Sequence, residues 1–160
     1  MNPIVKFKRL HKDAILPAYQ TAGAAGMDLH WDGRVGGADW LAGREDYRHA
    51  ALDVDLAPML FCTGLCVEIP EGFEGQIRPR SSLGKYGVHV FFGTIDNDYR
   101  GELKVRMMLL AGERGDTHRL QKGDRIAQLI IAPVSRATIV EAEELSETAR
   151  GAGGFGSTGK

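Results

Sequence analysis

The sequence predicts an all-β fold, either a closed barrel or a double-sheet jelly roll. Short runs of β-favouring apolar residues recur along the 160-residue chain, and turn signals that contain glycine separate them. The clearest run, Leu103–Leu109, has apolar residues at every second position with Lys104 and Arg106 between them, which is the alternation of a half-buried strand. A chain of this length corresponds to about one domain and is long enough to bury a real core.

Each expected strand is a short run of this kind that ends at a turn signal. Strands are expected at Ile4–Lys8, Met59–Phe61, Leu65–Ile69, Gln76–Arg78, Val88–Phe92, Leu103–Leu110, Arg125–Ile131 and Thr138–Val140. Hairpin turns are expected at Glu71-Gly72, Arg114-Gly115-Asp116 and Lys122-Gly123-Asp124. A short helix is expected at Ser81–Tyr86.

Two stretches fall outside this pattern. From Trp31 to about Asp53 the chain is polar and contains glycine without clear periodicity, which indicates a long surface insertion at about residues 31–56. Near the end, Glu141–Glu147 is acidic and glycine makes up most of residues 151–159, so this segment is expected to be mobile unless a ligand orders it. The predicted division is a β-barrel domain at 1–146 and a flexible glycine-rich arm at 147–160.

Composition and charge exclude several classes of function. The formal net charge is −1 and Lys and Arg form no long runs, so no nucleic acid is expected as a partner. No apolar run approaches the length of a membrane span, and the N-terminus lacks the apolar core of a signal peptide. Cys62 and Cys66 are expected to be free thiols in a reducing compartment, which predicts a cytoplasmic location. The five histidines lack metal-ligand spacing and are expected to be structural or surface residues.

The most informative segment runs from Gly93 to Leu103 and contains two acids, one aromatic ring and two glycines. A glycine-bounded turn of this kind projects side chains outward from a rigid hairpin. Asp96 is a candidate base for activating a water molecule, and Tyr99 is a candidate ring for stacking on a ligand. Simple turn chemistry for Asp96 and packing within the hairpin for Tyr99 are the alternatives.

Three further sites are candidates for holding a phosphate chain or its metal. Arg80-Ser81-Ser82 offers a guanidinium and two hydroxyls to one phosphate, although Ser81 or Ser82 would serve equally well as a helix N-cap. Asp28 follows a glycine-rich stretch and either holds a metal-bound water or closes a turn. Gln128 lies on an otherwise apolar strand, either at the rim of a site or in a hydrogen-bonded interface.

The glycine-rich tail contains two misleading patterns. Gly151–Gly156 fits the dinucleotide fingerprint and Gly154–Lys160 fits most of a P-loop, but neither has the strand and helix that these motifs require. The glycine amides can nevertheless surround an anion, and the tail adds charge, hydroxyls and a ring. The residues that supply these groups are Arg150, Phe155, Ser157 and Thr158. A solvated terminus is the alternative.

Taken in order, five segments resemble the five motifs of the trimeric dUTPases. These segments are Ala25–Leu29, Arg78–Leu83, Gly93–Gly101, Gly123–Leu129 and Arg150–Gly159. The match extends over about residues 20–159 and is specific, because order, spacing and tail all agree. The resemblance implies a distorted jelly-roll-like barrel assembled as a homotrimer, with active sites at subunit interfaces and the C-terminal arm closing over a neighbour's site.

The resemblance also implies the activity, the cofactor and the site. Members hydrolyse dUTP to dUMP and pyrophosphate with Mg²⁺, which limits uracil incorporation into DNA and supplies dUMP for thymidylate synthesis. Asp96 would be the general base on the water that attacks the α-phosphorus, and Asp28 would contact Mg²⁺ through water. The substrate-binding residues implied are Arg80, Ser81, Ser82, Gly93, Thr94, Ile95, Tyr99, Lys104, Gln128, Arg150, Phe155, Gly156, Ser157 and Thr158.

Within this set the resemblance implies separate roles. Tyr99 would stack beneath the deoxyribose and leave no room for a 2′-hydroxyl. Backbone groups of Gly93–Ile95 and of Lys104 would contact the uracil edge and discriminate against other bases. The motif that contains Arg80 and the side chain of Gln128 would hold the phosphate chain, while the tail would cover the uracil and engage the outer phosphates.

The sequence departs from the family pattern in two places. The segment from His30 to Ala57 is longer than the family usually carries. Val88–Phe92 runs directly into Gly93, so that Phe91 and Phe92 stand where many members place an Asn for base contact. Two alternatives remain open: a dCTP deaminase, which shares the fold but not the full tail pattern, and a regulatory binding protein, which only the long insertion suggests.

Overall fold

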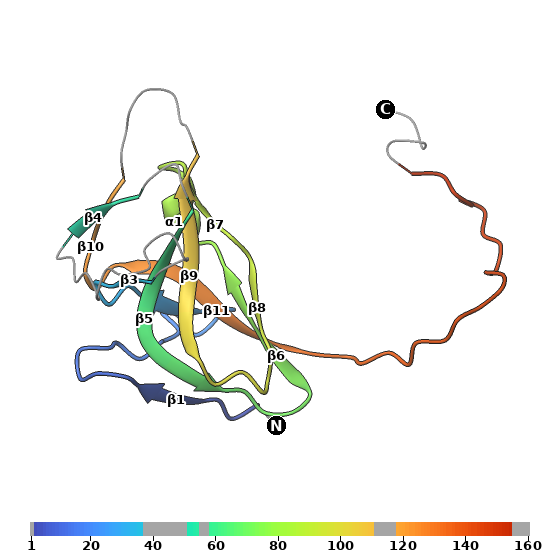
Figure 1. Cartoon of the computed structure of the whole chain (residues 1–160), viewed down its shortest axis with the longest axis horizontal. Helices are drawn as coiled ribbons and strands as arrows, with labels where there is room; N and C mark the ends of the chain where they lie inside the picture. Colours follow the sequence, from blue (N-terminus) through green and yellow to red (C-terminus); the bar gives the residue numbers. More distant parts are fainter. Residues whose placement is uncertain (1, 37–50, 55–57, 111–117, 155–160) are drawn as a thin grey trace.

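The computed structural model describes residues 2–36, 51–54, 58–110 and 118–154. Nearly all of its regular structure is β-strand, as Figure 1 shows. The strands are β1 (Lys6–Arg9), β2 (Met27–His30), β3 (Val35–Gly36), β4 (Ala51–Asp53), β5 (Met59–Glu68), β6 (Phe73–Arg78), β7 (Val88–Val90), β8 (Gly93–Ile95), β9 (Glu102–Leu109), β10 (Arg119–Gln121) and β11 (Arg125–Pro133), and the helix is α1 (Ser81–Gly84). The all-β prediction is confirmed.

The strands form two larger antiparallel sheets. The first has the order β1-β5-β9-β7, with β3 also paired to β5, and the second has the order β2-β11-β6-β8. A separate two-stranded sheet joins β4 to β10. Strands that follow one another in the sequence therefore commonly lie in different sheets, which is the connectivity of a jelly roll rather than of a simple meander.

One apolar core joins the two larger sheets. Phe61 and Leu103 from the first sheet and Leu29, Ile126 and Leu129 from the second are completely buried and belong to a single cluster. On β9 the side chains alternate between buried and exposed up to Met107, as the sequence predicts. Burial of side chains this size contributes roughly 1.5–3 kcal/mol each, so the cluster is the main source of stability.

Two turns predicted as hairpins connect strands of different sheets instead. The Glu71-Gly72 turn joins β5 to β6, and the Lys122–Asp124 turn joins β10 to β11, but neither pair of strands is hydrogen-bonded together. Gly72 and Gly123 both have positive φ angles, so the turn chemistry is present as expected. A turn signal is local and does not specify the partner of the next strand. The third predicted turn, Arg114–Asp116, lies outside the described residues.

The expected insertion begins later than the sequence indicates. Trp31 is completely buried, donates its indole N–H to the Arg34 carbonyl at 2.8 Å and packs edge-on against Phe61. Val35 and Gly36 then pair with β5 as β3, and β4 pairs with β10 at the other end of the stretch. Residues 31–36 and 51–54 therefore belong to the barrel, and residues 37–50 lie outside the described part.

β5 is one strand where the sequence indicates two, because a bulge at Gly64 lets the strand continue. Cys62 pairs with Lys104 and Cys66 with Glu102, so between these two pairs β5 contains more residues than its partner β9. Gly64 has φ +70°. Both cysteines are free, with Cys62 buried, as expected.

The predicted strand at Thr138–Val140 is wrong. After β11 the chain leaves the barrel as an extended segment, and Figure 1 shows its described part running away from both sheets. Ile139 and Leu145 are 94% and 88% exposed. A strand needs a neighbour to accept its hydrogen bonds, and the described chain places none beside this segment. In the described residues, no helix has the length and apolarity to cross a bilayer.

Candidate active site

Four polar side chains, from β2, from β11 and from the connection after β6, meet in what we call the Asp28 cluster. Asp28 lies on β2 directly opposite Gln128 of β11, and Gln128 in turn lies opposite Arg78 of β6. Arg80 follows β6 by two residues and reaches back across the sheet. The cluster consists of Asp28, Arg80, Arg125 and Gln128. The pairing of β2, β11 and β6 therefore brings three of the sequence-predicted site residues together.

Asp28 is the centre of this cluster and is only 1% exposed. Its Oδ1 accepts hydrogen bonds from Arg80 Nε at 3.1 Å and from Gln128 Nε2 at 3.3 Å, and its Oδ2 accepts one from Arg125 Nη1 at 3.2 Å. Arg80 Nη1 also donates to the Arg125 carbonyl at 3.0 Å. One carboxylate thus holds two guanidinium groups, and the cluster carries net positive charge that suits a polyanion.

His30, at the end of β2, lies in the field of this cluster. Burial lowers the pKa of His30, the negative charge of Asp28 partly opposes this, and the positive charges of Arg125 and Arg80 lower it further. Its Nδ1 is buried and has no hydrogen-bond partner. The ring is therefore held neutral, so the two arginines supply the positive charge at this site.

The Ser81 and Ser82 hydroxyls are free to bind a ligand. The N-cap of α1 is Arg80, in extended conformation, and no side chain caps the helix, so the predicted N-cap role of Ser81 or Ser82 is wrong. Both serines are exposed, next to the arginine that joins them to the cluster. Leu83 is buried in the core and anchors this short helix to the barrel.

The second group of predicted residues lies on the Asp96 turn, by which we mean residues 93–101. β7 and β9 pair directly, but between them the chain crosses to the other sheet, where β8 pairs with β6. The segment is thus wider than the tight hairpin that the sequence indicates. Asp96 follows β8 and is exposed, and its carbonyl accepts from the Tyr99 N–H at 3.1 Å, which closes the turn.

Tyr99 folds back over Gly101. Its hydroxyl donates to the Glu102 carbonyl at 2.9 Å, and its ring is 41% exposed. A Cβ at Gly101 would lie 2.4 Å from the Tyr99 hydroxyl and 2.6 Å from Cζ, so only glycine leaves room for this ring position. One ring edge is held by the turn and the rest is accessible to a flat ligand.

The other predicted base-contacting groups lie on both sheets. Gly93, Thr94 and Ile95 form β8 in the second sheet, while Lys104 lies on β9 in the first, opposite Cys62. Phe91 and Phe92 stand where many family members place an Asn. Phe91 packs edge-on against His89, with ring centroids 5.0 Å apart, and Phe92 is 73% exposed.

One chain does not bring the Asp96 turn to the Asp28 cluster. Asp28 and Ile95 lie on the two outer strands of the β2-β11-β6-β8 sheet. Across the sheet, Asp28 is in register with Arg78 of β6, whereas Ile95 is in register with Gly75, three residues earlier on the same strand. Three strand spacings of about 4.8 Å and three residue rises of about 3.3 Å place these Cα atoms roughly 17 Å apart. A hollow of about 340 Å³ beside Asp96 is lined by Glu71, Glu74 and Arg136 among others, and its acids disfavour a triphosphate.

The tail residues stand apart from both groups. Arg150 Nε donates to the Gly153 carbonyl at 2.7 Å within a local turn of the tail, and Figure 1 shows the described chain after β11 running away from the barrel. Phe155, Gly156, Ser157 and Thr158 lie outside the described residues. The structure therefore unites Asp28, Arg80 and Gln128, with the two serines beside them, and leaves the other predicted residues separate.

The donor set suits a magnesium ion that the substrate carries. Across the described ranges, no group of three or more His, Cys, Asp and Glu side chains is placed to hold a metal. Asp28 is the one carboxylate of the Asp28 cluster and already accepts three hydrogen bonds. Its remaining lone pairs can accept a hydrogen bond from a metal-bound water, but the cluster lacks the several ligands that direct coordination of a metal needs. Mg²⁺ commonly binds through substrate phosphates and retains its waters, so this arrangement fits.

Sequence reasoning assigned no role to Arg125 or His30. Arg125 lies within the Gly123–Leu129 motif, three residues before Gln128 on the same strand, and this spacing near a predicted site residue is the signal that was present. His30 lies two residues after Asp28 on β2, which puts both side chains on the same face of the strand.

Comparison with known proteins identifies the family of this chain. A family model described as dUTPase matches residues 50–159. The deoxyuridine 5′-triphosphate nucleotidohydrolase of Nautilia profundicola is 48% identical, over 98% of this chain and 99% of its own, and that of Rhizobium etli is 49% identical, over 90% and 85%.

Among solved structures, the dUTPase of Staphylococcus bacteriophage 80alpha with dUPNHPP has a TM-score of 0.75 and 24% identity, covering 98% of this chain and 99% of its own. A dUTPase variant from phage phi11 of S. aureus, described as revealing the coordination of a structural Mg(II) ion, has a TM-score of 0.69 and 19% identity, with 88% and 97% coverage. These two likenesses establish the fold. The sequence matches over nearly the whole chain establish more: this chain belongs to the dUTPase family.

Proposed function

We propose that this chain hydrolyses dUTP to dUMP and pyrophosphate, with water attacking the α-phosphorus. Family membership supports the activity, since relatives 43–49% identical are named deoxyuridine 5′-triphosphate nucleotidohydrolases. The observation that carries the proposal is the Asp28 cluster, in which a buried carboxylate holds two arginines and a glutamine as anion donors. The reaction would limit uracil incorporation into DNA and supply dUMP for thymidylate synthesis.

The triphosphate would lie against the Asp28 cluster. Arg80 and Arg125 offer guanidinium N–H groups, Gln128 offers its amide, and the exposed hydroxyls of Ser81 and Ser82 lie next in the chain. Held by Asp28, the arginines need little rearrangement on binding, so less conformational entropy is lost. Magnesium carried by the phosphates would neutralise part of their charge. Asp28 would contact the ion through a water molecule.

Asp96 would act as the general base. Its carboxylate is exposed on the turn and is free of arginine or lysine partners in the described chain. It would accept a proton from the attacking water, which contributes about 10²–10⁴-fold to a rate. Tyr99 on the same turn would stack beneath the deoxyribose, and backbone groups of Gly93–Ile95 and Lys104 would contact the uracil edge.

The site would be completed by neighbouring copies of the chain in a homotrimer. The separation of roughly 17 Å between the Cα atoms of Asp28 and Ile95, estimated from strand spacings, supports this, because side chains on one chain cannot span it. A closed ring with a repeated head-to-tail contact would bring the Asp96 turn of one copy to the Asp28 cluster of the next.

The arm would close over a neighbour's site. The division expected from the sequence, a barrel at 1–146 followed by an arm at 147–160, stays a prediction; β11 ends at Pro133, and an extended segment leads from it towards the arm. The exposed apolar side chains of Ile139 and Leu145 suit burial against another copy. Arg150, Phe155, Gly156, Ser157 and Thr158 would then engage the uracil and the outer phosphates. The cytoplasmic location expected from the sequence stays a prediction.

Pyrophosphate release from dUTP, dCTP, dTTP and UTP, with and without Mg²⁺, tests the activity. We expect turnover of dUTP only. Asp96→Asn should retain dUTP binding and lose about 10²–10⁴-fold in turnover. Turnover near the wild-type rate in Asp96→Asn would remove this residue from its role, and release of ammonia from dCTP would replace the proposed activity.

Mixing two inactive variants tests the shared site. Asp96→Asn keeps the Asp28 cluster, and Arg80→Ala keeps the Asp96 turn, so each variant alone should be inactive. In randomly mixed trimers, about one site in four would combine an intact cluster with an intact turn, if these come from adjacent copies. Recovery of about a quarter of wild-type activity is the expected result, and no recovery from verified mixed trimers contradicts the shared site.

A further inference from the structure

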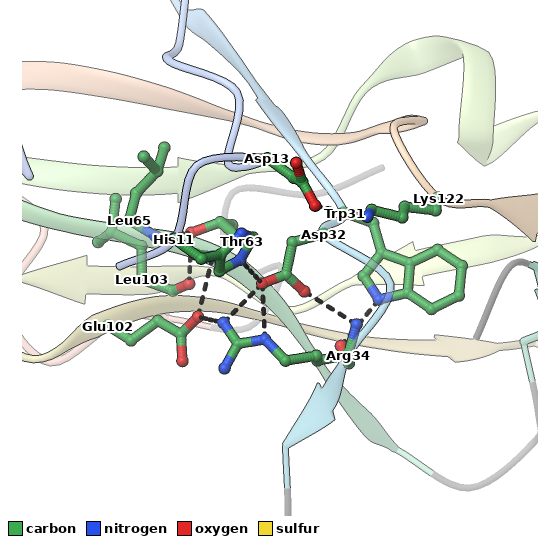
Figure 2. A network of polar contacts seen from close by, with 11 residues as sticks. His11, Asp13, Trp31, Asp32, Arg34, Thr63, Leu65, Glu102, Leu103 and Lys122 are labelled. Carbon is green, nitrogen blue, oxygen red and sulfur yellow. Dashed lines mark hydrogen bonds and ion pairs between the residues drawn. The ribbon is translucent and has the colours of Figure 1, made fainter. Parts of the chain in front are cut away.

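Figure 2 shows a buried ion-pair network that reaches Glu102, the residue directly after the Asp96 turn in the chain. Its centre is the Asp32 carboxylate, whose side chain is 1% exposed. Asp32 Oδ2 accepts hydrogen bonds from Arg34 Nε at 2.8 Å and Nη2 at 2.5 Å and contacts His11 Nε2 at 2.9 Å, while Oδ1 accepts from the Arg34 backbone N–H at 2.9 Å. We call these residues, together with Glu102, the Arg34 network.

Arg34 connects this carboxylate to the first residue of β9. Its Nη2 also donates to Glu102 Oε1, and the same oxygen accepts the Gly64 backbone N–H at 2.9 Å. The side chains of Arg34 and Glu102 are only 15% and 12% exposed. Glu102 is therefore held from two directions, by a guanidinium from the β2–β3 connection and by the bulge of β5.

The held residue is the one that anchors Tyr99. The Tyr99 hydroxyl donates to the Glu102 carbonyl at 2.9 Å, so the position of Glu102 determines where the ring is tethered. A continuous series of contacts thus runs from Asp32 through Arg34 and Glu102 to Tyr99. Asp32 lies four residues after Asp28, so a single segment supports both the Asp28 cluster and the Asp96 turn.

The network is closely packed. A Cβ at Gly64 would lie 2.5 Å from His11 Nε2 and 3.1 Å from Asp32 Oδ2. Burial alone would raise the pKa of Asp32, but hydrogen bonds from His11 and Arg34 outweigh it, and the pKa is lowered. The carboxylate is therefore ionised at neutral pH, and truncating Arg34 would leave two buried carboxylates without their shared cation.

We propose that Arg34 is a positioning residue for substrate selection: by holding Glu102 it fixes the Tyr99 ring, and through that ring it favours deoxyribose over ribose. The proposal rests on the proposed dUTPase function, in which Tyr99 lies beneath the sugar. Arg34 itself does not touch the substrate. Its loss would free the Glu102 side chain and loosen the first residue of β9, so that the Glu102 backbone carbonyl holds the Tyr99 hydroxyl less firmly and space opens for a 2′-hydroxyl.

The test compares kcat/KM for dUTP and for UTP in Arg34→Gln, Arg34→Lys and Tyr99→Phe. Arg34→Gln should lower the dUTP/UTP ratio about fivefold, because it weakens the tether of the Tyr99 ring without removing the Tyr99 hydroxyl. Arg34→Lys keeps the charge but not the fork, so it should recover part of the ratio. Tyr99→Phe removes the hydroxyl tether itself, and should lower the ratio about tenfold, the effect of losing one well-placed hydrogen bond, without changing the unfolding midpoint.

The double variant decides whether Arg34 acts through Tyr99. If it does, Arg34→Gln/Tyr99→Phe should lose about tenfold, like Tyr99→Phe alone, rather than the product of the two single losses. Glu68→Gln is the matched control, because Glu68 lies on the same strand as Gly64. This variant removes an exposed ion pair, the Lys6–Glu68 contact at 2.6 Å. It should leave the ratio unchanged.

Three outcomes would overturn the proposal. The first is an unchanged dUTP/UTP ratio in folded Arg34→Gln, or in Arg34→Lys where Arg34→Gln does not fold, which would assign Arg34 to stability alone. The second is strict additivity in the double variant, and the third is an equal loss in Glu68→Gln. If Arg34→Gln does not fold, Arg34→Lys replaces it in the cycle with Tyr99→Phe. Failure of the proposed function would be seen separately, as a wild-type chain that does not hydrolyse dUTP.

Discussion

Gly101 lies so close to the Tyr99 ring that an alanine there would displace the ring. The added Cβ would lie 2.4 Å from the Tyr99 hydroxyl, 2.6 Å from Cζ and 2.9 Å from Cε2. Real Cβ atoms do not approach other heavy atoms this closely, so the ring must rotate away. The rotation would break the hydrogen bond from Tyr99 to the Glu102 carbonyl.

The size of the effect follows from the two interactions that the rotation removes. The hydrogen bond contributes about 1 kcal/mol, and apolar contact of the part-buried ring with the deoxyribose contributes about 1–2 kcal/mol. Gly101→Ala should therefore lose about 2–3 kcal/mol of transition-state stabilisation, or roughly 30–150-fold in kcat/KM. Stability should change little, because the displaced ring is already part exposed.

Steady-state pyrophosphate release from dUTP measures this loss, and urea unfolding checks the fold. Gly23→Ala is the control, since an added Cβ there meets nothing within 4 Å. It should keep wild-type kcat/KM. Full activity in Gly101→Ala would show that Tyr99 need not lie where the structure places it, and would refute the assignment of this ring to the substrate.

Three further predictions concern stability and reactivity. Gly64→Ala should lower the free energy of unfolding by about 2–4 kcal/mol, because φ is +70° and the new Cβ would lie 2.5 Å from His11 Nε2; a loss below about 1 kcal/mol in urea would contradict the packing around His11. Hydrogen bonds from His11 and Arg34 outweigh burial and lower the pKa of Asp32. The contribution of the ionised Asp32 to folding stability is therefore present above its unfolded pKa of about 3.9 and is lost as pH falls through the lower folded pKa. Asp32→Asn should flatten the curve of stability against pH below about pH 4, and an acid limb identical to that of the wild type would refute this. Burial raises the pKa of Cys62 to about 12, so iodoacetamide at pH 8 should label Cys66 alone, and two adducts on the intact folded protein would be inconsistent with the core.

The fold class was predictable because strand periodicity is a local signal. Leu103–Leu109 and Arg125–Ile131 are strands as expected, since alternating or continuous apolar residues follow directly from how a sheet is buried. Pairing is not local. The Glu71-Gly72 turn has the chemistry of a hairpin but joins strands of different sheets, and Thr138–Val140 has the composition of a strand but no neighbour in the described chain.

The candidate site divides in the same way. Asp28, Arg80 and Gln128 could be predicted because each lies in a motif, and the structure brings them together. Arg34 and His11 lie in polar stretches with no periodicity, where a charged residue is ordinarily on the surface. Their burial depends on Gly64 and Glu102, which are distant in the sequence, so no local pattern marks them.

The boundary of the insertion decides what its removal would measure. A deletion of residues 31–56, the range that the sequence suggests, would remove Trp31, Asp32 and Arg34 together with the inserted segment. Trp31 exchanges backbone hydrogen bonds with the turn that precedes Arg125, at 2.9 Å to the Asp124 carbonyl and 2.8 Å from the Gly123 N–H. Such a deletion would therefore disturb both the Asp28 cluster and the Arg34 network, and would abolish hydrolysis whatever the insertion does. Only a deletion confined to residues 37–50 separates a segment that shapes the site from one that serves another partner.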